Sequence, residues 1–176
     1  MGHARVALVN LGCRVNRAEL DAMARELASH GCELVDEDGA EVVVVNTCAV
    51  TVEAQAKARH AVRHAASRPG VRLVVATGCA ATLFADELDG AAEPSPRSTP
   101  RAVSGAAPVT PTGRMRPGLK IQDGCDRRCT YCIVWKARGP ARSLDAADVI
   151  ERVRRLEADG AREVVLTGID LGRYRC

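Results

Sequence analysis

Short apolar runs alternate with apolar residues at helical spacing along the first ninety positions of the chain. Runs of this length, rich in Val and Leu, predict buried strands, and the stretches between them predict amphipathic helices. This alternation is typical of βα units and predicts an α/β fold with a parallel sheet. The expected strands are 6–10, 32–35, 42–45 and 73–76.

Local signals place the two helices between these strands. Asn16, with Glu19 three positions later, is a candidate cap for the first helix, and Gly31 is its expected end. Thr51 is a candidate cap for the second helix. The apolar face of the first helix is expected to hold Leu20, Met23 and Leu27, and that of the second Ala54, Ala58, Ala61, Val62 and Ala65.

The composition changes after residue 90 to Pro, Ser, Ala, Thr and Arg without apolar periodicity. We therefore expect a first domain over 1–90, a flexible linker over 91–116 and a second domain over 117–176. The second domain has strand patterns at 119–121 and 163–167, with a helix between them capped by Ser143 or Asp145. This predicts one βαβ unit, because an eight-fold (β/α) barrel needs about 250 residues.

Three cysteines lie close together in a loop pattern after strand 119–121. Cys125, Cys129 and Cys132 can hold three corners of an iron–sulfur cube, since thiolates are the ligands of such clusters. A cube held by three thiolates keeps one iron open to a small molecule. The alternative is a structural zinc site, which needs a fourth ligand and usually offers paired Cys-x-x-Cys hooks.

Three further cysteines each follow a predicted strand directly. Cys13, Cys48 and Cys79 come after the first, third and fourth strands. The carboxyl ends of parallel strands share one edge of the sheet, where open α/β sheets bind ligands, so these cysteines should converge into a second three-thiolate site. The alternative is that all three are buried as small apolar residues. Cys32 and Cys176 are assigned no role.

Charge and composition suggest where the protein acts and on what. The formal net charge is +3, but residues 94–143 hold ten Lys or Arg against two Asp, a local net charge of +8. This suits a polyanionic partner such as RNA, although the arginines can equally be merely solvated. Eight cysteines without a secretory leader, and no apolar run near ~20 residues, predict a cytoplasmic protein outside the membrane.

Six short motifs surround the cysteines and the arginines near them. They are NLGCRVN at 10–16, VNTCAVT at 45–51, TGC at 77–79, IQDGC at 121–125, ARG at 137–139 and RS at 142–143. Together they resemble the radical-SAM methylthiotransferases, where SAM is S-adenosylmethionine. The motif sequences are most similar to the branch that modifies N6-threonylcarbamoyladenosine in tRNA. The alternatives are the branches acting on isopentenyladenosine in tRNA or on a ribosomal-protein aspartate, and a non-enzymatic metal- and RNA-binding module.

The resemblance implies two 4Fe–4S clusters. Cys125, Cys129 and Cys132 would hold the cluster that binds SAM, with Tyr131 and Gly168 as further SAM contacts. An auxiliary cluster carrying the sulfur would take its ligands from the other set. That set is Cys13, Cys48 and Cys79.

The resemblance also implies a reaction and its partners. A methylthio group would be placed on C2 of adenosine 37, beside the tRNA anticodon, with a flavodoxin or ferredoxin as electron donor. Arg138 and Arg142 are candidates either for tRNA phosphate or for pairing with an acid. The fold would be a methylthiotransferase N-terminal domain followed by the first βαβ unit of an incomplete radical-SAM barrel, so we expect this chain to be an inactive fragment. No oligomeric state is predicted.

Overall fold

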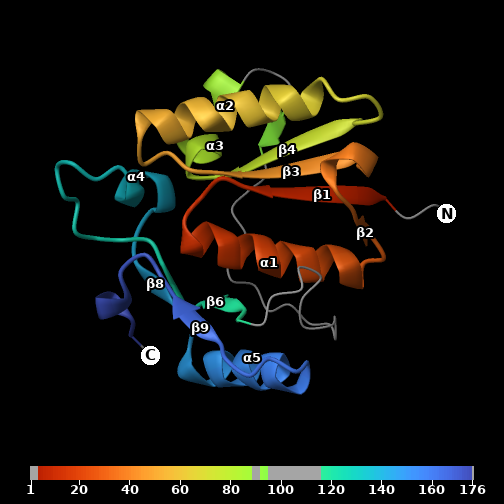
Figure 1. The fold of residues 1–176 in the computed structure, drawn as a ribbon. Helices are drawn as coiled ribbons and strands as arrows, with labels where there is room; N and C mark the ends of the chain where they lie inside the picture. Colours follow the sequence, from red (N-terminus) through yellow and green to blue (C-terminus); the bar gives the residue numbers. More distant parts are fainter. Residues whose placement is uncertain (1–3, 89–91, 95–115, 176) are drawn as a thin grey trace.

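The first part of the chain forms a fully parallel five-stranded sheet. The computed structural model describes residues 4–88, 92–94 and 116–175. The strand order is β2-β1-β3-β4-β5, and every neighbouring pair runs parallel (Figure 1). The strands are β1 (Arg5–Asn10), β2 (Glu33–Leu34), β3 (Val42–Thr47), β4 (Leu73–Gly78) and β5 (Ala92–Pro94).

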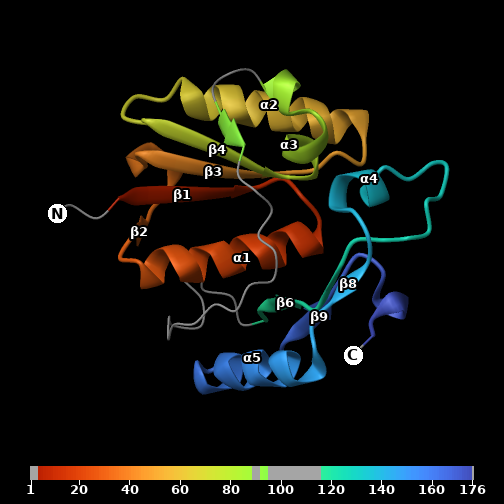
Figure 2. The same cartoon turned by 180° about the vertical axis from the view of Figure 1, so that it is seen from behind.

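Helices cover both faces of this sheet. Helix α1 (Arg14–Ser29) lies on one face, and helices α2 (Val52–Ala66) and α3 (Cys79–Leu83) lie on the other, as Figures 1 and 2 show from opposite sides. Short 3-10 helices follow β2 at Glu37–Gly39 and α3 at Ala85–Leu88. The chain changes direction across the sheet between β1 and β3, and such a switch point is where open α/β sheets bind ligands.

The apolar spacing of the sequence accounts for both helix–sheet layers. Leu20, Met23 and Leu27 of α1 pack in one cluster with apolar residues of β1 and β3. Ala58, Val62 and Ala65 of α2 are fully buried in the cluster on the opposite face. The run of valines in β3 supplies both clusters, as expected for a central strand covered on both faces.

Two of the three predicted N-caps are confirmed. Helix α5 (Ala146–Ala158) begins after Asp145, one of its two candidates, although the Asp145 side chain makes no capping hydrogen bond. Thr51 is the N-cap of α2, and its hydroxyl accepts a hydrogen bond from the Ala54 backbone N–H at 3.0 Å. Helix α1 instead begins after Cys13, so Asn16 lies within the helix and the prediction that it is a cap was wrong. Its side chain is buried and bonds to the sheet, so tertiary contacts outweigh the local capping pattern.

The second part contains the predicted βαβ unit. Strands β6 (Gly118–Lys120) and β9 (Val165–Thr167) pair in parallel, and helix α5 (Ala146–Ala158) lies between them in the chain. Val149, Val153 and Leu156 of α5 pack against this pair. Strand β6 contacts α1, so α1 lies between the five-stranded sheet and the second part (Figure 2).

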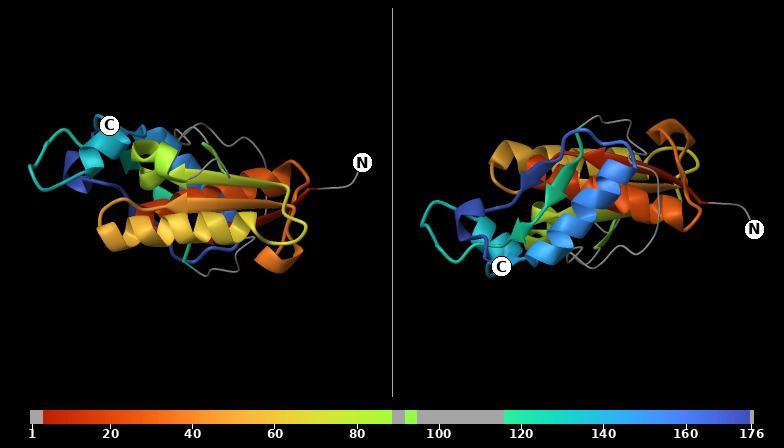
Figure 3. Two further views of the ribbon diagram at one scale, coloured as in Figure 1. Left: turned by 90° about the horizontal axis from the view of Figure 1, so that it is seen from above. Right: turned by 90° about the horizontal axis from the view of Figure 1, so that it is seen from below.

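The loop with three cysteines projects from this unit. Strands β7 (Gln122–Asp123) and β8 (Arg142–Ser143) pair antiparallel, and between them lie the cysteines and helix α4 (Val134–Arg138). A 3-10 helix at Leu171–Arg173 follows β9. Both views in Figure 3 show the loop at the end of the sheet opposite the N-terminus.

The expected linker is only partly within the described residues. Residues 92–94 form strand β5, parallel to β4, although they belong to the stretch 91–116 that was expected to be a flexible linker. Residues 95–115 lie outside the described part of the chain.

Candidate metal centre

Three cysteines of the first part follow three adjacent strands. In the sheet register Asn10 pairs with Asn46, and Thr47 pairs with Gly78, so β1, β3 and β4 end side by side. Cys13 precedes α1, Cys48 follows β3 directly, and Cys79 begins α3. Cys13 and Cys48 thus flank the switch point between β1 and β3, and all three cysteines follow strands that end at one edge of the sheet, the edge that the strand pattern predicted.

A buried amide network fixes the backbone at this edge. Asn16 donates to the Asn46 side chain at 2.8 Å and to the Thr47 carbonyl at 3.0 Å, while Asn46 donates to the Asn16 carbonyl at 2.8 Å. The Thr47 hydroxyl donates to the Thr77 carbonyl and accepts from the Ala81 backbone N–H. The start of α1 and the ends of β3 and β4 are therefore tied together next to the cysteines.

The three thiols differ in their surroundings. Cys13 is exposed and donates to the Asn16 side-chain oxygen at 3.2 Å, Cys48 is half-buried, and Cys79 is buried. Burial raises the pKa of the Cys79 thiol, and the nearby positive charge of Arg138 opposes that rise. Cys48 lies close enough to raise the pKa of Cys79 further.

The loop with Cys125, Cys129 and Cys132 is closed at its base. The Cys125 backbone N–H donates to the Gly139 carbonyl at 3.0 Å, and the Ala141 N–H donates to the Asp126 carboxylate at 3.1 Å. Gly124 has φ +73°, and a Cβ there would overlap the Pro140 carbonyl. Only glycine permits the two chain segments at the base of the loop to approach so closely.

A set of hydrogen bonds from Gln122 joins the base of the loop to the segment after β9. The buried Gln122 side chain donates to the carbonyls of Asp123 and Gly124 at 2.9 and 2.8 Å, and accepts from the Asp170 N–H at 2.8 Å. Asp170 also accepts from Arg127 at 2.7 Å, and this pair raises the pKa of Arg127. Asp170 thereby lies beside Cys125, with 3.9 Å between carboxylate oxygen and sulfur.

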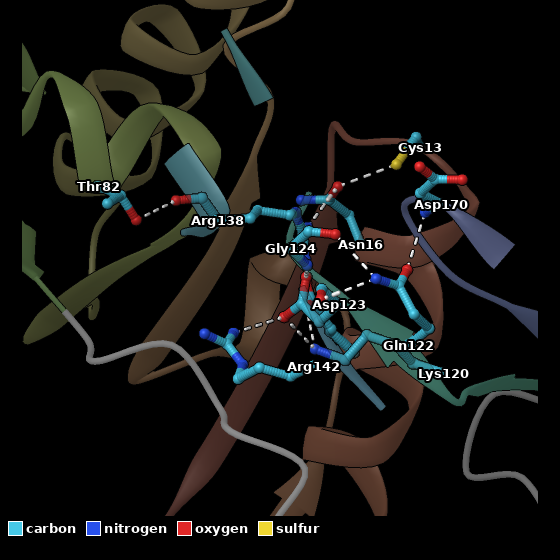
Figure 4. A network of polar contacts seen from close by, with 12 residues as sticks. Cys13, Asn16, Thr82, Lys120, Gln122, Asp123, Gly124, Arg138, Arg142 and Asp170 are labelled. Atoms are coloured by element: carbon cyan, nitrogen blue, oxygen red, sulfur yellow. Dashed lines mark hydrogen bonds and ion pairs between the residues drawn. The ribbon is translucent and has the colours of Figure 1, made fainter. Parts of the chain in front are cut away.

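A buried ion network connects the two cysteine regions (Figure 4). Glu19 of α1 lies 2.6 Å from both Lys120 of β6 and Arg138 of α4. Asp123 lies 3.0 Å from Arg138 and 3.1 Å from Lys120, and also pairs with Arg142. Burial alone would raise the pKa of Asp123, but Lys120 and Arg138 outweigh it and hold that pKa below its ordinary value.

Little in the sequence pattern predicted this network. Glu19 was noted only as a capping partner, and Asp123 only as part of a motif. A charged residue within the apolar pattern of a helix, such as Glu19, was the one available signal, because buried charges are nearly always paired.

The two predicted SAM contacts lie in different surroundings. Tyr131 is 90% exposed and lies within the cysteine loop. Gly168 follows β9 directly, and a Cβ there would come within about 3 Å of the Gln122 and Leu171 side chains. Both roles stay predictions.

The thiols suit a cluster by their chemistry, but they are not assembled around one point. All six are free cysteines, whose thiolate form binds soft metals. Among residues 4–88, 92–94 and 116–175, no three Cys, His, Asp or Glu side chains are grouped closely enough to hold a metal ion. The backbone therefore gathers each set at one place without fixing the sulfurs in ligand geometry.

Most described cations of the basic segment 94–143 are paired with acids. Arg138 is only 2% exposed and pairs with Glu19 and Asp123, so its predicted alternative role at tRNA phosphate was wrong. Within the described part of this segment, Arg128 and Lys136 are the cations without a carboxylate partner, and both lie over the Trp135 ring. Most of the positive charge there is thus neutralised within the protein.

Two family models match the chain on either side of residues 96–118. Residues 5–95 match the model described as uncharacterized protein family UPF0004, and residues 119–171 match the radical SAM superfamily. The fold and the two cysteine sets thus define a protein that joins a parallel-sheet domain to the start of a radical-SAM domain.

Curated relatives resemble nearly the whole chain. A threonylcarbamoyladenosine tRNA methylthiotransferase MtaB of Aquifex aeolicus is 34% identical over 97% of this chain and 49% of its own length. A ribosomal protein uS12 methylthiotransferase RimO of Desulforudis audaxviator is also 34% identical, over 97% of this chain and 45% of its own. The MtaB of Bacillus subtilis is 32% identical over the same shares.

The chain belongs to the radical-SAM methylthiotransferase family. It spans about half the length of the curated relatives it matches. Membership of the radical SAM superfamily implies the use of SAM and a 4Fe–4S cluster. In the part of the chain that the structure describes, no helix is both long and apolar enough to cross a membrane.

Proposed function

We propose that this protein is a tRNA methylthiotransferase with two 4Fe–4S sites, acting on N6-threonylcarbamoyladenosine. Cys125, Cys129 and Cys132 would hold one cluster, and a second set would hold the other. The second set is Cys13, Cys48 and Cys79. Bound there, the first cluster would supply the electron that cleaves SAM and the second would supply the sulfur.

The observation that carries the proposal is the placement of both cysteine sets at one end of the molecule. One set follows three adjacent parallel strands, and the other lies in a loop held against the same end by the ion network of Glu19 and Arg138. Two isolated structural sites would not need this shared placement, whereas a reaction that uses both does.

The protein's own residues have defined tasks in this proposal. The closed base of the loop, with Gly124 against Pro140, presents the three loop cysteines together. The exposed ring of Tyr131 and the close-packed Gly168 would line the space for SAM. A flavodoxin or ferredoxin is the proposed electron donor, and the cytoplasm is the proposed location.

Iron counting after anaerobic reconstitution tests the two-site proposal. We expect about eight irons per chain in the wild type. Replacing Cys125, Cys129 and Cys132 together with Ala should leave about four, and so should replacing Cys13, Cys48 and Cys79. Cys32→Ala is the matched control and should keep about eight.

Two results would contradict the proposal in different ways. Zinc in place of iron at the loop would identify a structural site and not a cluster site. An unchanged iron count in the sheet-edge triple variant would show that those cysteines are not ligands.

The substrate is tested separately, because the relatives include both tRNA and ribosomal-protein enzymes. Mass spectrometry of tRNA nucleosides from cells with and without the gene should show the methylthio group on threonylcarbamoyladenosine. A methylthio group on isopentenyladenosine, or on ribosomal protein uS12 instead, would reassign the substrate.

A further inference from the structure

The Arg138 guanidinium has nearly all of its donors committed inside the protein. Its Nη1 lies 2.6 Å from Glu19 and 3.0 Å from Asp123, and its Nη2 lies 3.2 Å from Glu19 and 3.2 Å from Asn16. Arginine has five N–H donors, and the four on Nη1 and Nη2 match these four contacts. The fifth, on Nε, is buried and has no hydrogen-bond partner among the described residues.

The acceptor shared with Cys13 connects Arg138 to the sheet edge. The same Asn16 oxygen accepts from the Cys13 thiol at 3.2 Å and from Arg138 Nη2 at 3.2 Å. A thiolate ligand has no proton to donate, so metal binding by Cys13 would leave Arg138 as the group that holds this oxygen. Asn16 in turn holds the end of β3 through Asn46 and Thr47.

Arg138 also lies against the element that carries Cys79. Helix α4, which ends at Arg138, packs against helix α3, which begins at Cys79. Both side chains are buried, and the charge of Arg138 acts on Cys79. An unpaired buried N–H is costly unless it finds an acceptor.

The position of Arg138 in the chain connects the sheet edge to the loop with Cys125, Cys129 and Cys132. Arg138 comes six residues after Cys132, on the return limb of the loop, and Gly139 next to it accepts from the Cys125 N–H. The buried Arg138 side chain thus belongs to the segment that carries the loop cysteines, and it hydrogen-bonds to α1, the helix that follows Cys13.

We propose that Arg138 is a positioning residue shared by the two cysteine sites. It fixes the loop of Cys125, Cys129 and Cys132 relative to the sheet edge, and its free Nε–H serves a ligand sulfur at Cys79. The inference rests on the proposed two-cluster function, in which Cys79 is a ligand. Donors and positive charge near a cluster thiolate favour the reduced cluster.

The test measures the reduction midpoint potential of the sheet-edge cluster alone. In a background with Cys125, Cys129 and Cys132 replaced by Ala, we compare Glu19→Gln with the double variant Glu19→Gln/Arg138→Gln. The double variant removes one negative and one positive charge together, so the buried network is not left with an excess of negative charge, which destabilises proteins strongly. Arg138→Lys keeps the charge and loses the Nε–H, and Arg59→Gln removes a partly exposed cation of α2 that pairs with Glu87, outside the buried ion network.

Relative to the parent, we expect the midpoint potential to rise in Glu19→Gln, because a negative charge that acts on Cys79 is lost. We expect it to be lower in the double variant than in Glu19→Gln, lower in Arg138→Lys than in the parent, and unchanged in Arg59→Gln. A purely structural role would lower iron content or the melting temperature without moving the potential of the cluster that remains. An equal potential in all variants would overturn the positioning role and leave the two-cluster proposal intact. No iron in the parent chain would overturn the proposed function, and the role of Arg138 with it.

Discussion

Gly78 shows how closely single residues are constrained at the sheet edge. It precedes Cys79, adopts φ +91°, and a Cβ there would overlap the Asn46 side-chain oxygen and the Thr47 carbonyl. These are the groups that bind Asn16 and fix the strand ends. Gly70 has a similar φ, +88°, but a Cβ there would meet nothing within 4 Å.

This pair allows backbone strain to be separated from steric overlap. Gly70→Ala should lower the free energy of unfolding by about 1 kcal/mol, the cost of a side chain in the left-handed region. Gly78→Ala should lower the free energy of unfolding by clearly more, because the new methyl group would also overlap the Thr47 backbone. Urea unfolding monitored by circular dichroism measures both, and equal losses would show that the sheet edge can give way to a methyl group.

Helix α2 packs its inner face almost entirely through small side chains. Ala58, Val62 and Ala65 are each 0% exposed and lie against the sheet. Small residues allow the helix to approach the sheet closely, so neighbouring side chains have little room to move into a cavity.

Val62→Ala should therefore lower the free energy of unfolding by about 2 kcal/mol, from lost burial and the cavity left behind. Val52 in the same helix is 79% exposed, and Val52→Ala should change stability by less than about 0.5 kcal/mol. Urea denaturation of both variants measures the difference. A loss in Val62→Ala no larger than that in Val52→Ala would mean that the helix moves to refill the space.

The elements were predictable where local pattern decides them. Apolar runs located β1, β3 and β4 within two residues at each end, and the helical spacing located α2 and α5. The order of strands and cysteines then predicted that Cys13, Cys48 and Cys79 meet at one edge. The antiparallel pair β7–β8 escaped prediction because both strands are short and entirely polar, so no apolar run marks them.

At the scale of the molecule, the sequence could not reveal how its two parts meet. Arg138 pairs with Glu19 across 119 positions, and nothing in local charge spacing indicates such a partner. Asn16 matched a capping pattern, yet its side chain binds Asn46 and Arg138 instead. Long-range polar pairing is set by the packed fold, so it appears only once the elements are assembled.

The buried ion network that joins the two parts of the chain predicts that the stability of the protein depends on pH. The pKa of Asp123 in the folded protein lies below its ordinary value of 3.8 because Lys120 and Arg138 favour the carboxylate. Asp123 therefore adds stability above about pH 4, and this contribution is lost as the pH falls from about 4 through the lowered pKa. Metal-free Asp123→Asn should consequently lose less stability than wild type between pH 6 and pH 3.

Urea unfolding of the two proteins at both pH values measures this difference. Glu157→Gln is the control, since Glu157 is an exposed acid on α5 outside the buried ion network. If wild type and Asp123→Asn lose the same free energy of unfolding between pH 6 and pH 3, Asp123 is not the group whose protonation lowers the stability.

The pairing of Glu19 with Arg138 also has a consequence for how the protein is made. At roughly 5 to 20 residues per second, the ribosome needs about 6 to 24 s to add the 119 residues that separate them. The strands that end at Cys13, Cys48 and Cys79 are complete well before Arg138 leaves the ribosome. During synthesis Cys79, which is buried in the complete fold, is accordingly open to metal delivery or to oxidation until α4 packs against α3.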